Sequence, residues 1–325
     1  MFLSRPLFRI VPDNTQIAFM RGRVLGIAFS ALLSVLSLGL AFYPGLEKGI
    51  DFRGGIIMEI RTQGPADLGA LRGAMGGLDL GDVGLQQFGD DSTVLLRLPV
   101  QGQEGEEGAT QAAVNAVRGA LEQAAPGARI LRTEAVGNRV SAELFANSLI
   151  ALGMSMLAML VYIWFRFEWQ FAVGAIVTLV LETTKVVGFL AITRIEFSLT
   201  TVAAVLTIIG FSINDKVVVY DRMRENLRKY KTMPLRQLID KSINETLNRT
   251  VGTSMTLLLS ALPLALFGGD ALSGFAWTMV FGIIASTSSS IFIAAPILLF
   301  LGENRLRRGT EAPAPAAPPG AAPRR

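Results

Sequence analysis

Long apolar segments follow one another along most of this chain, and one large hydrophilic segment separates the first of them from the rest. A helix needs about 20 mostly apolar residues to cross a bilayer. Six stretches come close to that length, so the pattern predicts six membrane-spanning helices. They cover residues 24–43, 144–165, 171–192, 197–220, 249–268 and 272–301.

The hydrophilic segment, residues 44–142, has a pattern of short elements of its own. Strands are predicted at 55–62, 83–88, 93–98 and 128–136, and helices at 65–76 and 109–125. The order is βαββαβ, the split βαβ or ferredoxin-like arrangement. The sequence therefore predicts an α-helical polytopic membrane protein with six transmembrane helices and one external α+β domain.

Positive charges indicate the orientation of these elements. Lys and Arg gather in the segments 1–23, 221–248 and 302–325, whereas the two short loops on the other side hold only Arg194. Because cytoplasmic loops carry such an excess, we expect both termini in the cytoplasm and the domain 44–142 outside. The net charge of +4 then indicates contact with anionic lipid and not with nucleic acid.

Three further segments carry structural predictions. Residues 221–248 have apolar positions at helical spacing, so we expect an amphipathic helix along the membrane surface, with a solvated connector as the alternative for the first half. The Ala/Pro-rich tail 302–325 is expected to be disordered. The apolar run 24–43 is too long for a cleavable signal and is expected to remain as an anchor.

The composition excludes several kinds of chemistry. The chain has no cysteine and no histidine, which rules out disulfides and thiolate chemistry and argues against haem or zinc sites. The sequence contains no phosphate-binding loop and no nucleophile–base pair, so we expect neither an enzyme nor a cofactor. The energy for any transport by this protein must therefore come from an ion gradient or from ATP hydrolysis by a partner.

Asp215 is the most informative residue, because it lies near the end of the fourth predicted span with apolar residues on both sides. An ionised carboxylate in hydrocarbon costs roughly 2.5–3.5 kcal/mol on insertion scales, so such a group marks an ion path or meets a partner. Asn214 precedes it, and Arg222 lies two turns later on the same face. Lys216 points about 100° away and is expected to reach the headgroups. The alternative is an interfacial Asp215 at the helix end.

Other ionisable residues lie in or beside the third and fifth spans. Glu182 and Lys185 are three residues apart and can pair on one helix face, either for proton transfer or as a purely structural pair. Arg249 opens the fifth span among hydroxyl-bearing residues. An arginine stays charged, so its role would be to hold a nearby carboxylate ionised. The alternative is one more basic residue on the cytoplasmic side.

Several motifs resemble those of the SecD/SecF family of protein-export membrane proteins. Residues 49–55 (GIDFRGG) resemble its G-x-D-F-x-G-G signature, in which Gly49, Asp51, Gly54 and Gly55 are the defining positions. Similar segments follow in the family's order and cover nearly everything except the tail. They are residues 165–169 (FRFEW), 207–226 (TIIGFSINDKVVVYDRMREN), 246–254 and 289–296.

The resemblance implies half of an RND-type pseudo-symmetric unit in the bacterial inner membrane. It implies that the chain pairs with SecD and uses the proton gradient to drive late stages of protein export. The expected partners are SecD, the SecYEG channel, SecA, YajC, YidC and exported unfolded polypeptides. The alternatives are an RND-type small-molecule efflux component and a scaffold of the translocon that conducts no protons.

The resemblance also implies roles for particular residues. Asp215 and Arg249 match positions implicated in proton conduction, and we expect protonation of Asp215 to weaken its pairing with Arg249. The family often has His-Asp in the third span, where this chain has Leu181 and Glu182, and Lys185 replaces an apolar residue.

Overall fold

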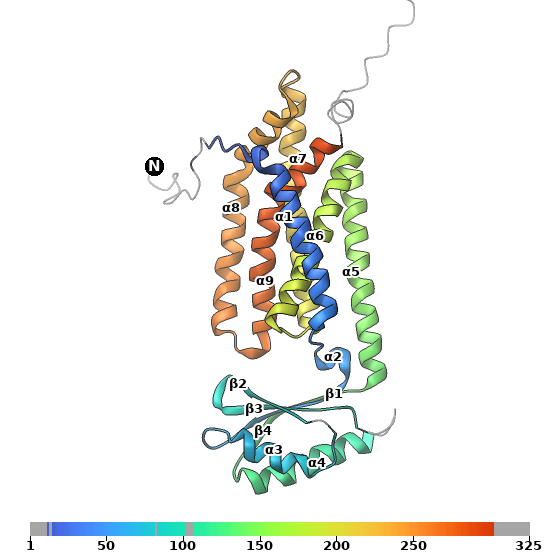
Figure 1. The fold of residues 1–325 in the computed structure, drawn as a ribbon, viewed down its shortest axis with the longest axis vertical. Coiled ribbons are helices and arrows are strands. Elements are labelled where there is room, and N and C mark those ends of the chain that lie inside the picture. The colour runs from blue at the N-terminus through green and yellow to red at the C-terminus, as the bar shows by residue number, and fades with distance from the viewer. Residues whose placement is uncertain (1–11, 13–14, 82, 102–106, 302–325) are drawn as a thin grey trace, which may run out of the picture.

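The computed structural model describes residues 12, 15–81, 83–101 and 107–301. Within these ranges, six apolar helices are long enough to cross a membrane, and a small α/β domain lies at one end of their bundle (Figure 1). The predicted tail 302–325, and residues 1–11 and 13–14 of the predicted N-terminal segment, lie outside the described ranges.

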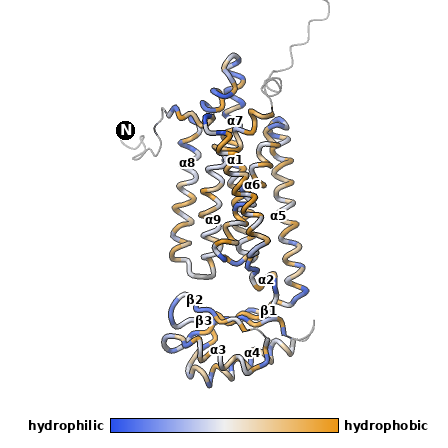
Figure 2. The backbone as a smooth tube through the Cα atoms, viewed as in Figure 1, coloured by the Kyte–Doolittle hydropathy of each residue, from blue (hydrophilic) through white to orange (hydrophobic). Residues whose placement is uncertain are grey.

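Six spans form the described part of the bundle, and two of them lie at its centre. The helices are α1 (Arg23–Leu40, between η1, Phe19–Gly22, and η2, Ala41–Gly45), α5 (Asn138–Arg166), α6 (Trp169–Thr193), α7 (Leu199–Lys229), α8 (Leu235–Phe267) and α9 (Asp270–Ser289), which continues through η3 (Ser290–Ala294) into α10 (Ala295–Phe300). The span that contains α9 and the α7 span are the most enclosed, whereas α1, α5 and α8 expose many large apolar side chains. Figure 2 shows that hydrophobic residues occur along the length of the bundle helices. Such a surface is stable against lipid and not against water.

Small residues let the helices approach closely. A Cβ atom at Gly188 on α6 would lie 2.2 Å from the Ser37 hydroxyl of α1, and one at Gly282 on α9 would lie 2.2 Å from Ile208 Cδ1 of α7. Helix association in a membrane depends on such van der Waals packing, because lipid tails are as apolar as the helices. The glycines therefore set the distances between the helices that carry the ionisable residues.

The α/β domain has the predicted element order βαββαβ. Its elements are β1 (Gly55–Arg61), α3 (Leu68–Gly76), β2 (Gly84–Phe88), β3 (Asp90–Leu98), α4 (Glu107–Ala124) and β4 (Arg129–Val136). The sheet is antiparallel in the order β2-β3-β1-β4. Alternate residues of β1, among them Met58, are buried with α3 and α4 in one core. The two helices cover the sheet face that points away from the bundle (Figure 1), so the other face points toward it.

The segment 221–248 differs from its prediction. α7 continues to Lys229 and α8 begins at Leu235, so only the loop 230–234 separates the two helices. The apolar residues that suggested a membrane-surface helix are buried in the helical core instead: Leu235, Leu238, Ile239, Ile243 and Leu247. A helical apolar period shows that one face is covered but does not show what covers it. Here the cover is protein, and the ends of α7 and α8 form a hairpin beyond the bundle (Figure 1).

Candidate functional site

Asp215 lies on α7 inside the bundle and is 3% exposed. The hydroxyls of Thr250 on α8 and Ser290 on η3 lie against its carboxylate. Even so, Asp215 Oδ2, Thr250 Oγ1 and Ser290 Oγ are all buried, and none of them has a hydrogen-bond partner within the part of the chain that the structure describes. Buried polar atoms are normally bonded, and a hydroxyl can donate to a carboxylate or accept from a protonated carboxyl. The surroundings of Asp215 therefore suit either protonation state.

A second buried cluster surrounds Glu182 on α6. Lys216 Nζ on α7 lies 2.9 Å from Glu182 Oε1, and the two residues are 0% and 2% exposed. Ser212 on α7 donates to Glu182 Oε2, and Ser289 on α9 donates to Glu182 Oε1. Three helices thus meet at one carboxylate, whose charge is balanced by one ammonium group.

This pairing corrects two sequence-based predictions. Lys185 does not pair with Glu182; its ammonium donates to the Ser30 hydroxyl of α1 at 2.9 Å. Lys216 does not extend to the headgroups, because its side chain is enclosed and bonded to Glu182. A lysine within an apolar helix turns toward the nearest acceptor, and the packing of α6 on α7 brings Glu182 to it. Lys216, Ser212 and Ser289 were not expected at this site, although a lysine inside an apolar run is itself a signal.

Arg249, Asn214 and Arg222, which the sequence also pointed to, are all more exposed than Asp215. No ion pair within 4.0 Å joins the described side chains of Asp215 and Arg249, and Arg249 is exposed on α8, one residue before Thr250. The predicted direct pair is therefore not formed in this structure. Asn214 is also exposed. Arg222 bonds Glu225 at 2.6 Å and Glu245 of α8 at 2.7 Å, so it holds the α7–α8 hairpin together.

The signature segment lies where the external domain meets the start of α7. Asp51 belongs to the one-turn helix α2 (Ile50–Arg53), and its Oδ2 accepts the backbone N–H of Leu199, the first residue of α7, at 2.9 Å. The backbone of Gly49 donates to Phe197 O at 2.9 Å, and Phe197 donates to Glu47 O at 2.6 Å. A carboxylate at a helix N-terminus satisfies a free N–H and complements the helix dipole. The segment therefore holds the N-terminal end of α7, the helix that carries Asp215.

Two of the three signature glycines are required by the backbone. Gly54 and Gly55 have φ values of +73° and +125°, which side-chain-bearing residues rarely adopt. A Cβ at Gly55 would lie 2.4 Å from the carbonyl oxygen of Leu98, the last residue of β3. These two positions allow the chain to pass from α2 directly into β1 beside that strand.

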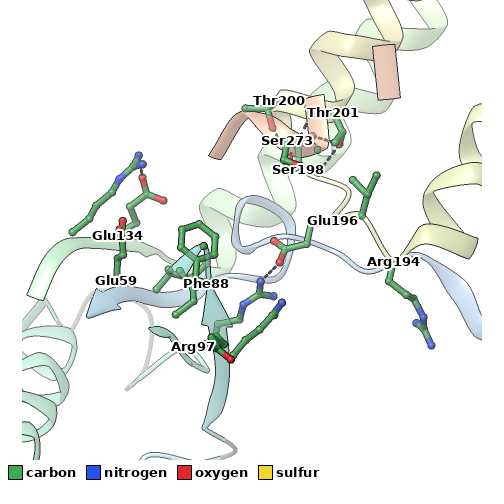
Figure 3. Close-up of a pocket in the computed structure, with 18 residues that line it drawn as sticks. Glu59, Phe88, Arg97, Glu134, Arg194, Glu196, Ser198, Thr200, Thr201 and Ser273 are labelled. Atoms are coloured by element: carbon green, nitrogen blue, oxygen red, sulfur yellow. Dashed lines mark hydrogen bonds and ion pairs between the residues drawn. The ribbon is translucent and has the colours of Figure 1, made fainter. Parts of the chain in front are cut away.

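A polar cleft of about 380 Å³ separates the open sheet face from the end of the bundle (Figure 3). Glu59 and Arg97 line it from the sheet, and Thr200 and Thr201 line it from the start of α7. An ion pair between Arg97 and Glu196, which lies in the α6–α7 loop, crosses it. The domain thus contacts the same loop through its sheet as well as through the signature segment. In the described part of the chain, no cluster of three or more acidic residues is placed to hold a metal ion.

A bundle of membrane-spanning helices with buried charges, tied at one end to an external α/β domain, defines a multi-pass membrane protein of the transport class. Residues 116–304 match the family described as protein export membrane protein SecD/SecF, C-terminal, and residues 44–66 match the SecD/SecF GG motif. The chain belongs to the SecD/SecF family.

Named relatives and solved structures agree with this assignment. Protein translocase subunit SecF of Rhodobacter capsulatus is 42% identical over 91% of this chain and 92% of its own length. The subunit of the same name from Rickettsia akari is 40% identical over 91% of this chain and 96% of its own. The crystal structure of SecDF, a translocon-associated membrane protein from Thermus thermophilus, matches 90% of this chain with a TM-score of 0.79 and 31% identity. This chain spans 39% of that SecDF chain.

Proposed function

We propose that this protein is an accessory subunit of the Sec protein translocase that uses the proton gradient to drive late stages of export across the bacterial inner membrane. Its relatives of nearly equal length are named as translocase subunits. The likeness to a solved SecDF structure and the SecF name of these relatives support SecD as its partner. SecYEG, SecA, YajC and YidC are further proposed partners, and both termini are proposed to lie in the cytoplasm.

One observation carries the proposal: a buried acid and the anchor of the external domain lie on the same helix. Asp215 is enclosed within α7, and the external N-terminus of α7 is held by Asp51 of the signature segment. Binding or loss of a proton changes the charge of Asp215, and burying that charge is costly. A change in the packing of α7 at Asp215 would therefore move the segment on which the external domain rests.

Arg249 and Glu182 have different proposed roles in this scheme. Arg249 lies on the exposed face of α8, where the related spans of SecD can pack against it, and it attracts Asp215 only while that carboxylate is ionised. Glu182 is already neutralised by Lys216. We therefore assign proton binding to Asp215, electrostatic control to Arg249, and a supporting place beside the pathway to Glu182.

The test is export of a secreted reporter into vesicles that contain the protein, SecD and the translocase. Export is compared with and without a proton gradient for the wild type, Asp215→Asn and Asp221→Asn. Asp221 is a matched control because it lies on the same helix but is only partly buried and is paired with Arg166. We expect gradient stimulation to be lost in Asp215→Asn and kept in Asp221→Asn. Equal stimulation in all three would show that the chain is a scaffold that conducts no protons.

A further inference from the structure

A basic pocket lies at the end of the bundle opposite the α/β domain. Six residues line it, and we call it the distal pocket: Arg166, Asp221, Arg224, Glu225, Arg228 and Lys229. Its volume is about 520 Å³. Arg166 is the last residue of α5, and the other five lie on the last turns of α7. The pocket therefore lies where the ends of two membrane helices come together.

The charges of the distal pocket are only partly compensated within the chain. Arg166 pairs with Asp221 at 3.1 Å, and Arg224 Nε lies 3.5 Å from Glu168. Glu225 is engaged by Arg222, outside the pocket. For Arg228 and Lys229, no carboxylate lies within 4.0 Å among the described residues; Lys229 rests over the Tyr230 ring, 5.3 Å from its centroid. Two cations that line the pocket are thus available to an anion.

The pocket lies at the depth of lipid headgroups. At 1.5 Å per residue, the roughly 30 Å of hydrocarbon takes up about 20 residues of α7 counted from Leu199, which places Asp221 and the residues after it in the polar layer. On α5, Trp164 and Phe165 directly precede Arg166 and are 62% and 88% exposed. Exposed aromatic rings at such a helix end are typical of the membrane interface. An apolar surface thus adjoins the cationic one.

We propose that the distal pocket binds the headgroup of an anionic phospholipid such as phosphatidylglycerol. Arg228 and Lys229 hold the phosphodiester oxygens, and the acyl chains lie along Trp164 and Phe165. A net negative headgroup is favoured over a zwitterionic one because the choline or ethanolamine cation would face the same two side chains. A soluble anion or an acidic protein segment would use the cations alone and leave the aromatic pair without a role.

Trp164 provides a direct probe of this site. The chain has three tryptophans, so Trp169→Phe and Trp277→Phe leave Trp164 as the reporter. The protein is placed in phosphatidylcholine bilayers, and fluorescence quenching is measured with brominated phosphatidylglycerol and, separately, with brominated phosphatidylcholine. We expect preferential quenching by phosphatidylglycerol. Arg228→Gln with Lys229→Gln is expected to weaken that preference by roughly fivefold for each cation removed.

The control removes the same charge elsewhere at this end of the bundle, with Arg21→Gln and Arg236→Gln, and is expected to keep the preference. Inorganic phosphate at millimolar concentration, and an oligoglutamate peptide, are not expected to relieve the quenching. Three results would overturn the proposal: an unchanged preference in the pocket variant, an equal loss in the control, or displacement of the lipid by phosphate or by the peptide. Asp215→Asn is expected to leave this readout unchanged, because Asp215 does not line the distal pocket, so the result is independent of the proposed proton coupling.

Discussion

The Asp51 carboxylate accepts a hydrogen bond from the backbone N–H of Leu199, although 148 positions separate the two residues in the sequence. Asp51 belongs to the segment from which the external domain begins, and Leu199 begins α7. Asp215 lies about 24 Å further along α7 at 1.5 Å per residue. One helix therefore connects the anchor of the domain to the buried acid, and this relationship makes the signature segment a target for mutation.

Asp51→Ala is expected to abolish most of the gradient stimulation of export while leaving gradient-independent export unchanged. The substitution removes the acceptor at the start of α7 and costs about 1 kcal/mol of stability, as loss of a helix cap does. The measurement is the vesicle export assay with and without a gradient, together with a thermal melt.

Asp67→Ala is the matched control for Asp51→Ala. Asp67 caps α3 in the same domain by accepting the N–H groups of Gly69 and Ala70 at 2.9 and 3.0 Å. It should cost similar stability without affecting the gradient response. If both variants respond to the gradient as the wild type does, Asp51 does not transmit motion from α7.

Glu182 and Lys216 are expected to behave as one unit. Each single change, Glu182→Gln or Lys216→Met, leaves a buried charge without its partner and should lower stability by about 3–5 kcal/mol. The double variant removes both charges and should regain most of that loss. The unfolding free energy of the four proteins, measured in one detergent, gives the coupling energy. A strictly additive double variant would contradict the pairing.

Lys185→Met tests the corrected assignment of the buried lysines. Among the described residues, Lys185 has only the Ser30 hydroxyl as a close hydrogen-bond partner, so the loss should be limited to about 1 kcal/mol, the net value of one hydrogen bond. Lys216→Met should cost several times more in the same melt. The reverse ranking would mean that Lys185, and not Lys216, neutralises Glu182.

Gly55→Ala is expected to destabilise the external domain. Its positive φ alone costs roughly 1–3 kcal/mol for a residue with a side chain, and the new Cβ would also meet the Leu98 carbonyl. Protease resistance of the domain should fall accordingly. Gly64→Ala, where a Cβ meets no atom within 4 Å, should leave the resistance unchanged. Equal resistance of the two variants would show that the approach of α2 to β3 does not depend on Gly55.

Local sequence patterns were sufficient to predict most of the helices and strands and their order. A run of about 20 apolar residues has few stable arrangements other than a membrane span, and the alternation in residues 55–62 places successive side chains of β1 on opposite faces. Asp215 and Glu182 could be singled out for the same reason, because an acid inside such a run is costly wherever the helix packs. The amphipathic period of residues 235–247 was equally clear, but the helical core of the protein, and not the membrane surface, covers it.

The sequence by itself determined the six spans, the βαββαβ domain and the identity of the buried ionisable residues, because each depends on the solvation or periodicity of neighbouring residues. Only the tertiary structure decided which groups meet. Glu182 bonds Lys216 from another helix and not Lys185 from its own, and Asp51 bonds Leu199 from 148 positions earlier in the sequence. These contacts depend on which helices pack together and at what rotation, which is decided by small residues such as Gly188 and Gly282 and by the shapes of distant side chains.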